Sequence, residues 1–157
     1  MKRLIAFAAL TVLACAAATT LLAQNPLVGT WKLNVAKSKY NSGAAPKSLT
    51  RTVEAQGDKM KYTFAGVSAD GSALTYTFTV SYDGKDYPIT GSGAPGGADT
   101  IAIKQLTPTS YDSILKKAGQ PVLTTKAQVS KDGKTTTLTQ ASVAGTGPTN
   151  TLVFEKQ

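Results

Sequence analysis

Apolar and polar residues alternate along most of the chain, which is the pattern of β-strands with one buried face. In residues 74–82, LTYTFTVSY, an apolar or aromatic side chain occupies every second position, with threonine or serine between. Residues 59–64, KMKYTF, repeat the pattern with Met60, Tyr62 and Phe64 on the apolar side. Because successive side chains of a strand point to opposite faces, each segment predicts a strand that is buried on one side. Such strands are typical of antiparallel sheets.

Eight further segments predict strands, which gives about ten in all and no amphipathic helix. A meander of this length usually curls and closes, because closure removes exposed sheet edges. The sequence therefore predicts an all-β fold, an antiparallel up-and-down barrel of about ten strands, as a single domain over residues 24–157. The eight segments are 27–34, 48–56, 86–91, 99–106, 110–117, 121–129, 134–142 and 149–156.

Glycine-containing turns separate these strands. Asp-Gly pairs at 70–71, 83–84 and 132–133 predict two-residue hairpin turns of type I′, which need positive φ at both central residues. Gly57-Asp58 and Gly119-Gln120 predict looser versions of the same turn. The two long irregular segments, residues 35–47 and 91–98, are expected to be loops at the rim of the barrel.

The N-terminus has the pattern of a secretory signal peptide. Lys2 and Arg3 precede a long apolar stretch, and the small residue Ala23 precedes a polar segment. We therefore expect residues 1–23 to be a signal peptide and the protein to be exported, to the periplasm or the extracellular space, without a transmembrane span after cleavage. Two alternatives stay open, a lipid anchor on Cys15 and a retained membrane anchor.

The composition excludes several kinds of chemistry. The chain has no histidine, and Cys15, within the predicted leader, is its only cysteine. Cys/His metal sites, disulfides and histidine-dependent catalysis are therefore excluded from the mature domain. We expect no metal, no cofactor and no catalytic residues; an enzyme would have to use carboxylate, lysine, tyrosine or serine groups. Two motif matches do not change this, because G-x-G-x-x-G at 91–96 leads into a strand and S-x-x-K at 113–116 lacks its partner motifs.

The charge is basic but dispersed. Removing Lys2 and Arg3 with the leader lowers the formal net charge from +8 to +6. Lys37, Lys39 and Lys47 lie in a stretch without acids and could bind an acidic surface, or they could simply form a solvated face. Dense basic clusters with interleaved aromatic residues are missing, so no nucleic-acid partner is expected.

Most aromatic residues fall on the apolar faces of the predicted strands. In a packed sandwich they would form a solid core. In a ten-stranded barrel the interior is wider, and the same side chains would line a ligand cavity. Arg51, the only arginine after the leader, would contact an anion if it points inward. The candidate wall residues are Tyr62, Phe64, Tyr76, Phe78 and Phe154, together with Arg51.

Three short segments resemble the calycins, the superfamily of lipocalins and fatty-acid-binding proteins. LVGTWKLN at 27–34 is similar to their first strand, NTLVFEKQ at 150–157 to their last, and VSKDGKTTTLTQ at 129–140 to a late hairpin. The overall likeness is greatest to exported bacterial lipocalin-like proteins without an established ligand. This resemblance implies a barrel plugged by Trp31 at one end, with a cavity for a small hydrophobic or amphipathic molecule.

The chain departs from the calycin pattern at the site itself. Residues 35–47 occupy the place of the helical lid of the fatty-acid binders, and the arginine and tyrosine of their carboxylate clamp correspond to Leu152 and Phe154. No arginine follows Arg51, so Trp31 must be capped differently than in lipocalins. The leading hypothesis is an exported small-molecule binding protein. The alternative is a solid β-domain that acts as a cell-envelope interaction or structural module.

Overall fold

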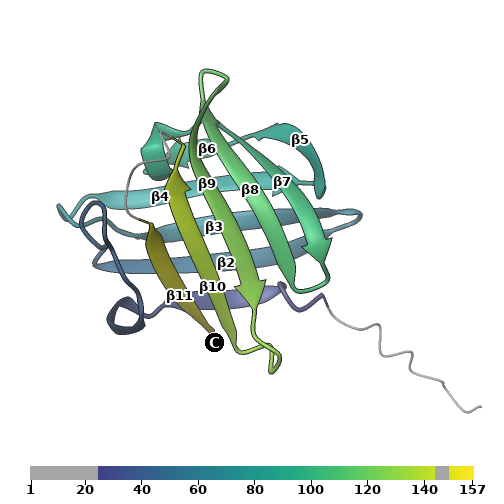
Figure 1. Ribbon diagram of the computed structural model, residues 1–157, viewed down its shortest axis with the longest axis horizontal. Helices are drawn as coiled ribbons and strands as arrows, with labels where there is room; N and C mark the ends of the chain where they lie inside the picture. Colours follow the sequence, from purple (N-terminus) through teal and green to yellow (C-terminus); the bar gives the residue numbers. More distant parts are fainter. Residues whose placement is uncertain (1–24, 144–148) are drawn as a thin grey trace, which may run out of the picture.

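The structure is a computed structural model that describes residues 25–143 and 149–157. Its strands form one 11-stranded antiparallel sheet that curls into a nearly closed barrel (Figure 1). The strands are β1 Gly29–Leu33, β2 Ser48–Gln56, β3 Lys59–Val67, β4 Ala73–Val80, β5 Asp83–Pro88, β6 Thr90–Ser92, β7 Thr100–Thr107, β8 Ser110–Lys117, β9 Gln120–Val129, β10 Thr135–Ser142 and β11 Asn150–Lys156. Two short 3-10 helices, η1 Val35–Lys37 and η2 Pro95–Gly97, lie in the loops.

The two edges of the sheet are joined by a single residue. The strand order is β5-β7-β8-β9-β10-β11-β1-β2-β3-β4-β6, so β5 and β6 are its outer strands. Only Ile89 separates them in the chain, and its backbone N–H donates to the carbonyl of Asp99 at 2.8 Å. The chain itself therefore brings the two edges together, which protects them from pairing with another molecule.

This arrangement confirms the predicted all-β barrel and corrects its fifth strand. The segment predicted as one strand over 86–91 is broken into β5, which pairs with β7, and β6, which pairs with β4. Pro88 ends β5 because proline has no N–H to donate to the ladder. The up-and-down order of ten strands is otherwise as expected, and the predicted signal peptide at residues 1–23 lies outside the described residues.

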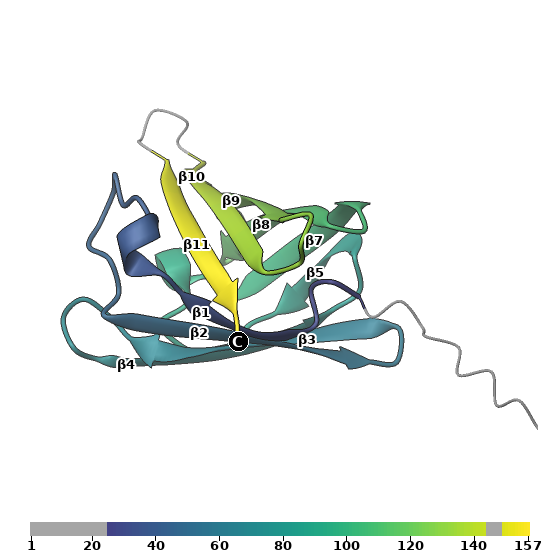
Figure 2. The ribbon, with the colours of Figure 1, turned by 90° about the horizontal axis from the view of Figure 1, so that it is seen from below.

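The strands lie in two layers that cross one another. Figure 2 shows β2, β3 and β4 in the lower layer and β7 to β11 in the upper one. The alternation seen in the sequence decides which side chains lie between the layers, since Met60, Tyr62 and Phe64 of β3 are buried and their neighbours are less so. The same holds for Leu74 and Tyr76 of β4. One face of each layer therefore forms the interior.

The Asp-Gly turns are not of the predicted type I′. Among the described residues Ala118 is the only non-glycine with positive φ, so the aspartates of these pairs keep negative φ. Instead, Oδ1 of Asp70, Asp83 and Asp132 accepts a hydrogen bond from the N–H two residues further on, at 2.8 to 3.0 Å. These are Asx-turns, in which the side chain replaces a backbone acceptor. The pair 83–84 also lies within β5 and does not join two paired strands.

Ala118 and Gly119 both have positive φ, with values of 49° and 76°. They form the two-residue connection between β8 and β9, one residue earlier than the predicted Gly119-Gln120 turn. The carboxylate of Asp99 accepts a hydrogen bond from the N–H of Ala118 at 2.8 Å. This tertiary contact helps a residue with a side chain to hold a conformation that glycine prefers.

The two long segments predicted as rim loops lie at the same end of the barrel, although residues 91 and 92 of the second belong to β6. Segments 34–47 and 93–98 meet the β3–β4 turn there, and this end is called the mouth below. The N-terminal segment from Asn25 and the C-terminal residue Gln157 lie at the opposite, closed end, where Gln157 N donates to Thr30 O. Within the described ranges no helix is long and apolar enough to span a membrane.

Candidate functional site

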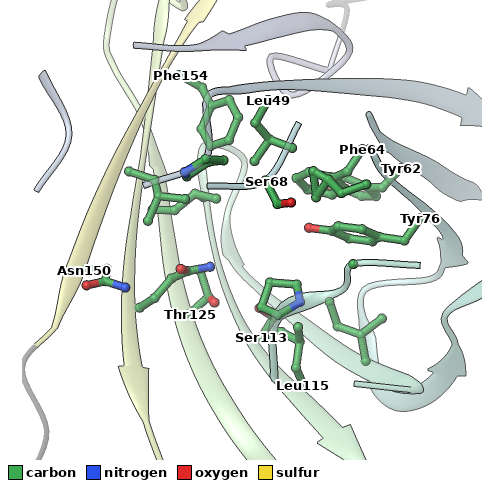
Figure 3. A pocket seen from close by; sticks show the side chains of 18 of the residues that line it. Leu49, Tyr62, Phe64, Ser68, Tyr76, Ser113, Leu115, Thr125, Asn150 and Phe154 are labelled. Atoms are coloured by element: carbon green, nitrogen blue, oxygen red, sulfur yellow. The ribbon is translucent and has the colours of Figure 1, made fainter. Parts of the chain in front are cut away.

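A cavity of about 290 Å³ occupies the mouth half of the barrel (Figure 3). Side chains from both layers line it, and the rim loops complete its upper part. A much smaller apolar cavity of about 150 Å³ can bind benzene, so this space is of ligand size. Its lining residues on strands are Leu49, Tyr62, Phe64, Leu74, Tyr76, Phe78, Ile101, Ile103, Tyr111, Ser113, Leu115, Thr125, Leu138, Gln140, Asn150, Leu152 and Phe154.

One side of the cavity is an aromatic wall, defined as Tyr62, Phe64, Tyr76 and Phe78 of β3 and β4. The residues are direct partners across the two strands, so their rings pack in pairs. The ring centres of Tyr62 and Phe78 lie 5.0 Å apart, and those of Phe64 and Tyr76 lie 4.7 Å apart at an interplanar angle of 10°. Such stacking fixes the rings, so the wall is preformed before any ligand arrives.

The opposite side carries a polar row, defined as Ser113, Thr125 and Gln140 of β8, β9 and β10. Ser113 pairs with Thr125, and Thr125 pairs with Gln140, so the three stand side by side at one level of the barrel. Figure 3 shows Thr125 across the cavity from Tyr62, Phe64 and Tyr76. The cavity is therefore aromatic on one side and hydrogen-bonding on the other.

The loop at the mouth, residues 34–47, is held by specific contacts rather than by a helical lid. Asn34 caps η1 by accepting from Lys37 N at 3.0 Å, and Lys39 exchanges two backbone hydrogen bonds with Thr151. Asn150 at the start of β11 accepts from the backbone N–H groups of Asn41 and Ser42 and donates to Ser42 O. These contacts fix the part of the loop that closes over the cavity.

Tyr40 of this loop also lines the cavity. Its hydroxyl is buried and has no hydrogen-bond partner among the described residues. Burial raises the pKa of Tyr40 to about 12, so the phenol stays protonated at physiological pH. The mouth thus presents a buried hydroxyl whose hydrogen-bonding capacity is unused.

The closed end is filled by Trp31 and the groups around it. Trp31 and Arg51 are both fully buried, and the indole Nε1 donates to Leu27 O at 2.9 Å. The guanidinium carbon of Arg51 lies 5.2 Å from the centre of the Trp31 ring and 5.1 Å from that of Phe154. Lys156 Nζ lies over Trp31 at 5.0 Å. Trp31 is therefore capped by an arginine of β2 and a lysine of β11, in place of the late-strand arginine expected in lipocalins.

Arg51 points into the barrel, where it is fully buried, but it does not line the cavity. Its Nη2 donates to Thr136 Oγ1 at 3.0 Å, and Nη1 lies 3.5 Å from the hydroxyl of Tyr111. Within the described ranges it forms no salt bridge, and its Nε has no partner. The prediction that Arg51 contacts a ligand anion directly is not supported by this position, because Tyr111 and Phe154 lie between it and the cavity.

Three tyrosines gather near Arg51, and the phenols of two of them, Tyr62 and Tyr82, remain protonated. The hydroxyls of Tyr62 and Tyr82 are 2.5 Å apart, and the ring of Tyr111 packs against both. Burial raises the pKa of Tyr62 well above its usual value and that of Tyr82 to about 12. A phenolate that could act as a general base is therefore disfavoured here.

The cavity itself is uncharged. Among the described residues that line it there is no aspartate, glutamate, lysine or arginine. Among all the residues that the structure describes, no three His, Cys, Asp or Glu side chains lie close enough together to hold a metal ion. The expectations of no catalytic residue, no metal and no cofactor stay predictions.

Sequence reasoning identified one side of this cavity and missed the other. Tyr62, Phe64, Tyr76, Phe78 and Phe154 all line it, and their role as ligand contacts stays a prediction. Ser113, Thr125 and Gln140 were not identified, although each occupies an inward position in an alternating strand. A search for polar residues at strand positions where the alternation expects an apolar side chain would have found them. Only the pairing register of the strands shows that the three residues are neighbours.

The basic residues considered for an acidic partner lie outside the cavity. Lys37 Nζ forms an exposed ion pair with Glu155 at 2.8 Å, and the hydrogen bond from Lys37 holds the pKa of Glu155 below its usual value. Lys39 and Lys47 are exposed. Binding of an acidic surface through Lys37, Lys39 and Lys47 stays a prediction.

No protein-family model matches the sequence, and no curated protein matches it either. Among solved structures, the fold is similar to the selenomethionine derivative of a biogenic amine-binding protein, with a TM-score of 0.47 and 12% sequence identity. The match covers 85% of this chain and 65% of the other, so the chain spans less than two thirds of that protein's length.

Proposed function

We propose that this protein is a calycin-like binding protein that holds a small, uncharged, mainly apolar molecule in its barrel. The cavity of about 290 Å³ is the observation that supports this function. A solid β-domain would be expected to fill this half of the barrel with side chains, as Trp31, Arg51 and Val53 fill the other half. The up-and-down strand order and the tryptophan in the first strand support the calycin-like assignment.

The lining limits the charge of the molecule. An ion transferred from water into an apolar cavity loses its hydration, and this cost is offset only by a partner of opposite charge or by many hydrogen bonds. No carboxylate among the described lining residues could receive an ammonium group, and Arg51 lies behind Tyr111 and Phe154. An uncharged molecule therefore fits this lining best.

Binding can be tested with naphthalene as the probe, followed by its own fluorescence in an equilibrium titration. Two neighbouring positions of β8 provide a matched pair of variants, because Leu115 lines the cavity and Ile114 is 40% exposed. Leu115→Phe should weaken naphthalene binding about tenfold or more by filling the space, and Ile114→Phe should leave it unchanged.

The charge limit can be tested in the same assay with 2-naphthoate and 2-naphthylmethylamine at pH 7. Both should bind more weakly than naphthalene. The proposed function would be wrong if no neutral probe of this size bound the wild-type protein, or if Leu115→Phe and Ile114→Phe bound naphthalene equally well. Tighter binding of either ion would contradict the uncharged ligand class.

We further propose that the protein acts after export. This rests on the signal-peptide pattern of residues 1–23, and cell fractionation with N-terminal sequencing tests it. Soluble protein beginning near Gln24 is expected in the exported fraction; protein beginning at Cys15 with a lipid attached would show the anchored form instead.

A further inference from the structure

Two side chains of the polar row, Ser113 and Thr125, are buried, and their hydroxyl groups have no partner among the described residues. Ser113 and Thr125 are each only 5% exposed and line the cavity. Neither hydroxyl makes a hydrogen bond to another of the described residues. Buried polar side chains are nearly always hydrogen-bonded, and leaving one unpaired is costly. These two groups therefore lack a partner that a bound molecule could supply.

The row is continuous across three strands. Because Ser113, Thr125 and Gln140 are register partners, their polar ends lie at one level, about one strand spacing apart. Asn150 of β11 is the register partner of Gln140 and extends the row, but its side-chain amide already forms hydrogen bonds with the mouth loop. Hydroxyls and an amide both donate and accept, so the row can bind hydroxyl, carbonyl or amide groups.

The opposite side is apolar over most of its area, and the hydroxyl of Tyr76 is the one polar group of the aromatic wall without a partner among the described residues. Phe64 and Phe78 have no polar atom, and the Tyr62 hydroxyl is engaged with that of Tyr82. A molecule in the cavity therefore meets apolar rings on one side and hydrogen-bonding groups on the other. The volume, about twice that of a cavity that binds benzene, suits a molecule of about two fused rings.

We propose that the ligand is an uncharged molecule of about two fused rings that carries hydroxyl, carbonyl or amide groups along one edge, and that Ser113, Thr125 and Gln140 recognise this edge. The inference rests on the proposed function, because it assigns the ligand class of the same cavity. It excludes a plain hydrocarbon and an alkyl chain with a charged head as preferred ligands.

The test compares 2-naphthol with naphthalene at pH 7, where both are uncharged and differ by one hydroxyl group. Wild-type protein should bind 2-naphthol at least about fivefold more tightly, the gain expected from one net hydrogen bond in a buried site. Thr125→Val and Ser113→Ala should each reduce this ratio, and the double variant should bring it close to one.

Thr139→Val provides the matched control, because Thr139 is the neighbour of Gln140 on β10 and is exposed on the outer face. It should bind both probes as the wild type does. Circular dichroism and urea unfolding show whether Thr125→Val and Ser113→Ala fold normally, and naphthalene binding by each variant is the internal standard.

Two failures are distinguishable. If naphthalene and 2-naphthol bind equally well to the wild type, or if the ratio is unchanged in the double variant, the polar row does not select the ligand and the inference is wrong, although the proposed function stands. If neither probe binds the wild type, the proposed function itself fails.

Discussion

The two halves of the barrel interior differ in both charge and packing. The closed end contains a buried guanidinium, Arg51, packed against Trp31 and Phe154, and all three side chains are fully buried. The mouth half contains no charged lining residue within the described ranges and leaves a cavity of about 290 Å³. The same sheet thus provides a rigid base at one end and a binding space at the other.

This difference indicates how stability and binding are separated along the barrel axis. Side chains that fill the closed end contribute to folding through burial and cation–π contacts. Side chains around the cavity contribute less, because a void gives them fewer packing partners. Substitutions at the closed end should therefore change stability, and substitutions at the cavity should change ligand binding.

The largest effect is expected for Trp31→Ala. Truncation of a fully buried aromatic side chain costs about 3–5 kcal/mol of unfolding free energy. Urea unfolding followed by circular dichroism measures it. A loss below about 1 kcal/mol would show that Trp31 does not stabilise the closed end.

Arg51→Lys should have the next largest effect. The charge is kept, but the flat guanidinium that packs against Trp31 and Phe154 is lost, and desolvated cation–π contacts contribute about 2 kcal/mol. We expect a loss of that size in urea unfolding with little change in naphthalene affinity. A change in affinity without loss of stability would place Arg51 in the ligand site instead.

A matched pair of enlarging substitutions compares the two halves directly. Val53→Phe inserts a larger side chain into the packed end, where Val53 is 1% exposed. It should lower the free energy of unfolding by about 1–3 kcal/mol. Leu115→Phe inserts one beside the cavity and should cost less than about 1 kcal/mol, since space is available. Equal losses in thermal or urea unfolding would contradict the difference in packing.

The smallest effect is expected for Lys37→Gln. The ion pair with Glu155 lies on the surface, with 65% and 38% of the two side chains exposed, and such pairs contribute about 0.5 kcal/mol or less. The free energy of unfolding should fall by no more than this amount, and the affinity for naphthalene should be unchanged. A marked loss of binding would show that the ion pair controls the mouth loop.

The sequence was informative where the pattern is local. Alternation with a period of two decides which side chains of one strand share a face, so Tyr62 could be grouped with Phe64, and Tyr76 with Phe78, without a structure. The absence of histidine likewise excluded histidine-dependent catalysis and Cys/His metal sites without a structure. Hairpin turns could be located from glycine, but their type depended on side-chain hydrogen bonds that the Asp-Gly pattern alone did not reveal.

Three features were decided by the tertiary structure. Ser113, Thr125 and Gln140 are 12 and 15 residues apart in the chain, and only the register of β8, β9 and β10 aligns them into one polar row. The depth of Arg51 below the cavity depends on how Trp31 and Phe154 pack around it. The break at Ile89 depends on the meeting of the two sheet edges. By itself the sequence determined most of the strands and which side chains of each strand share a face, because the alternation is local. The cavity and its polar row required pairing between distant strands.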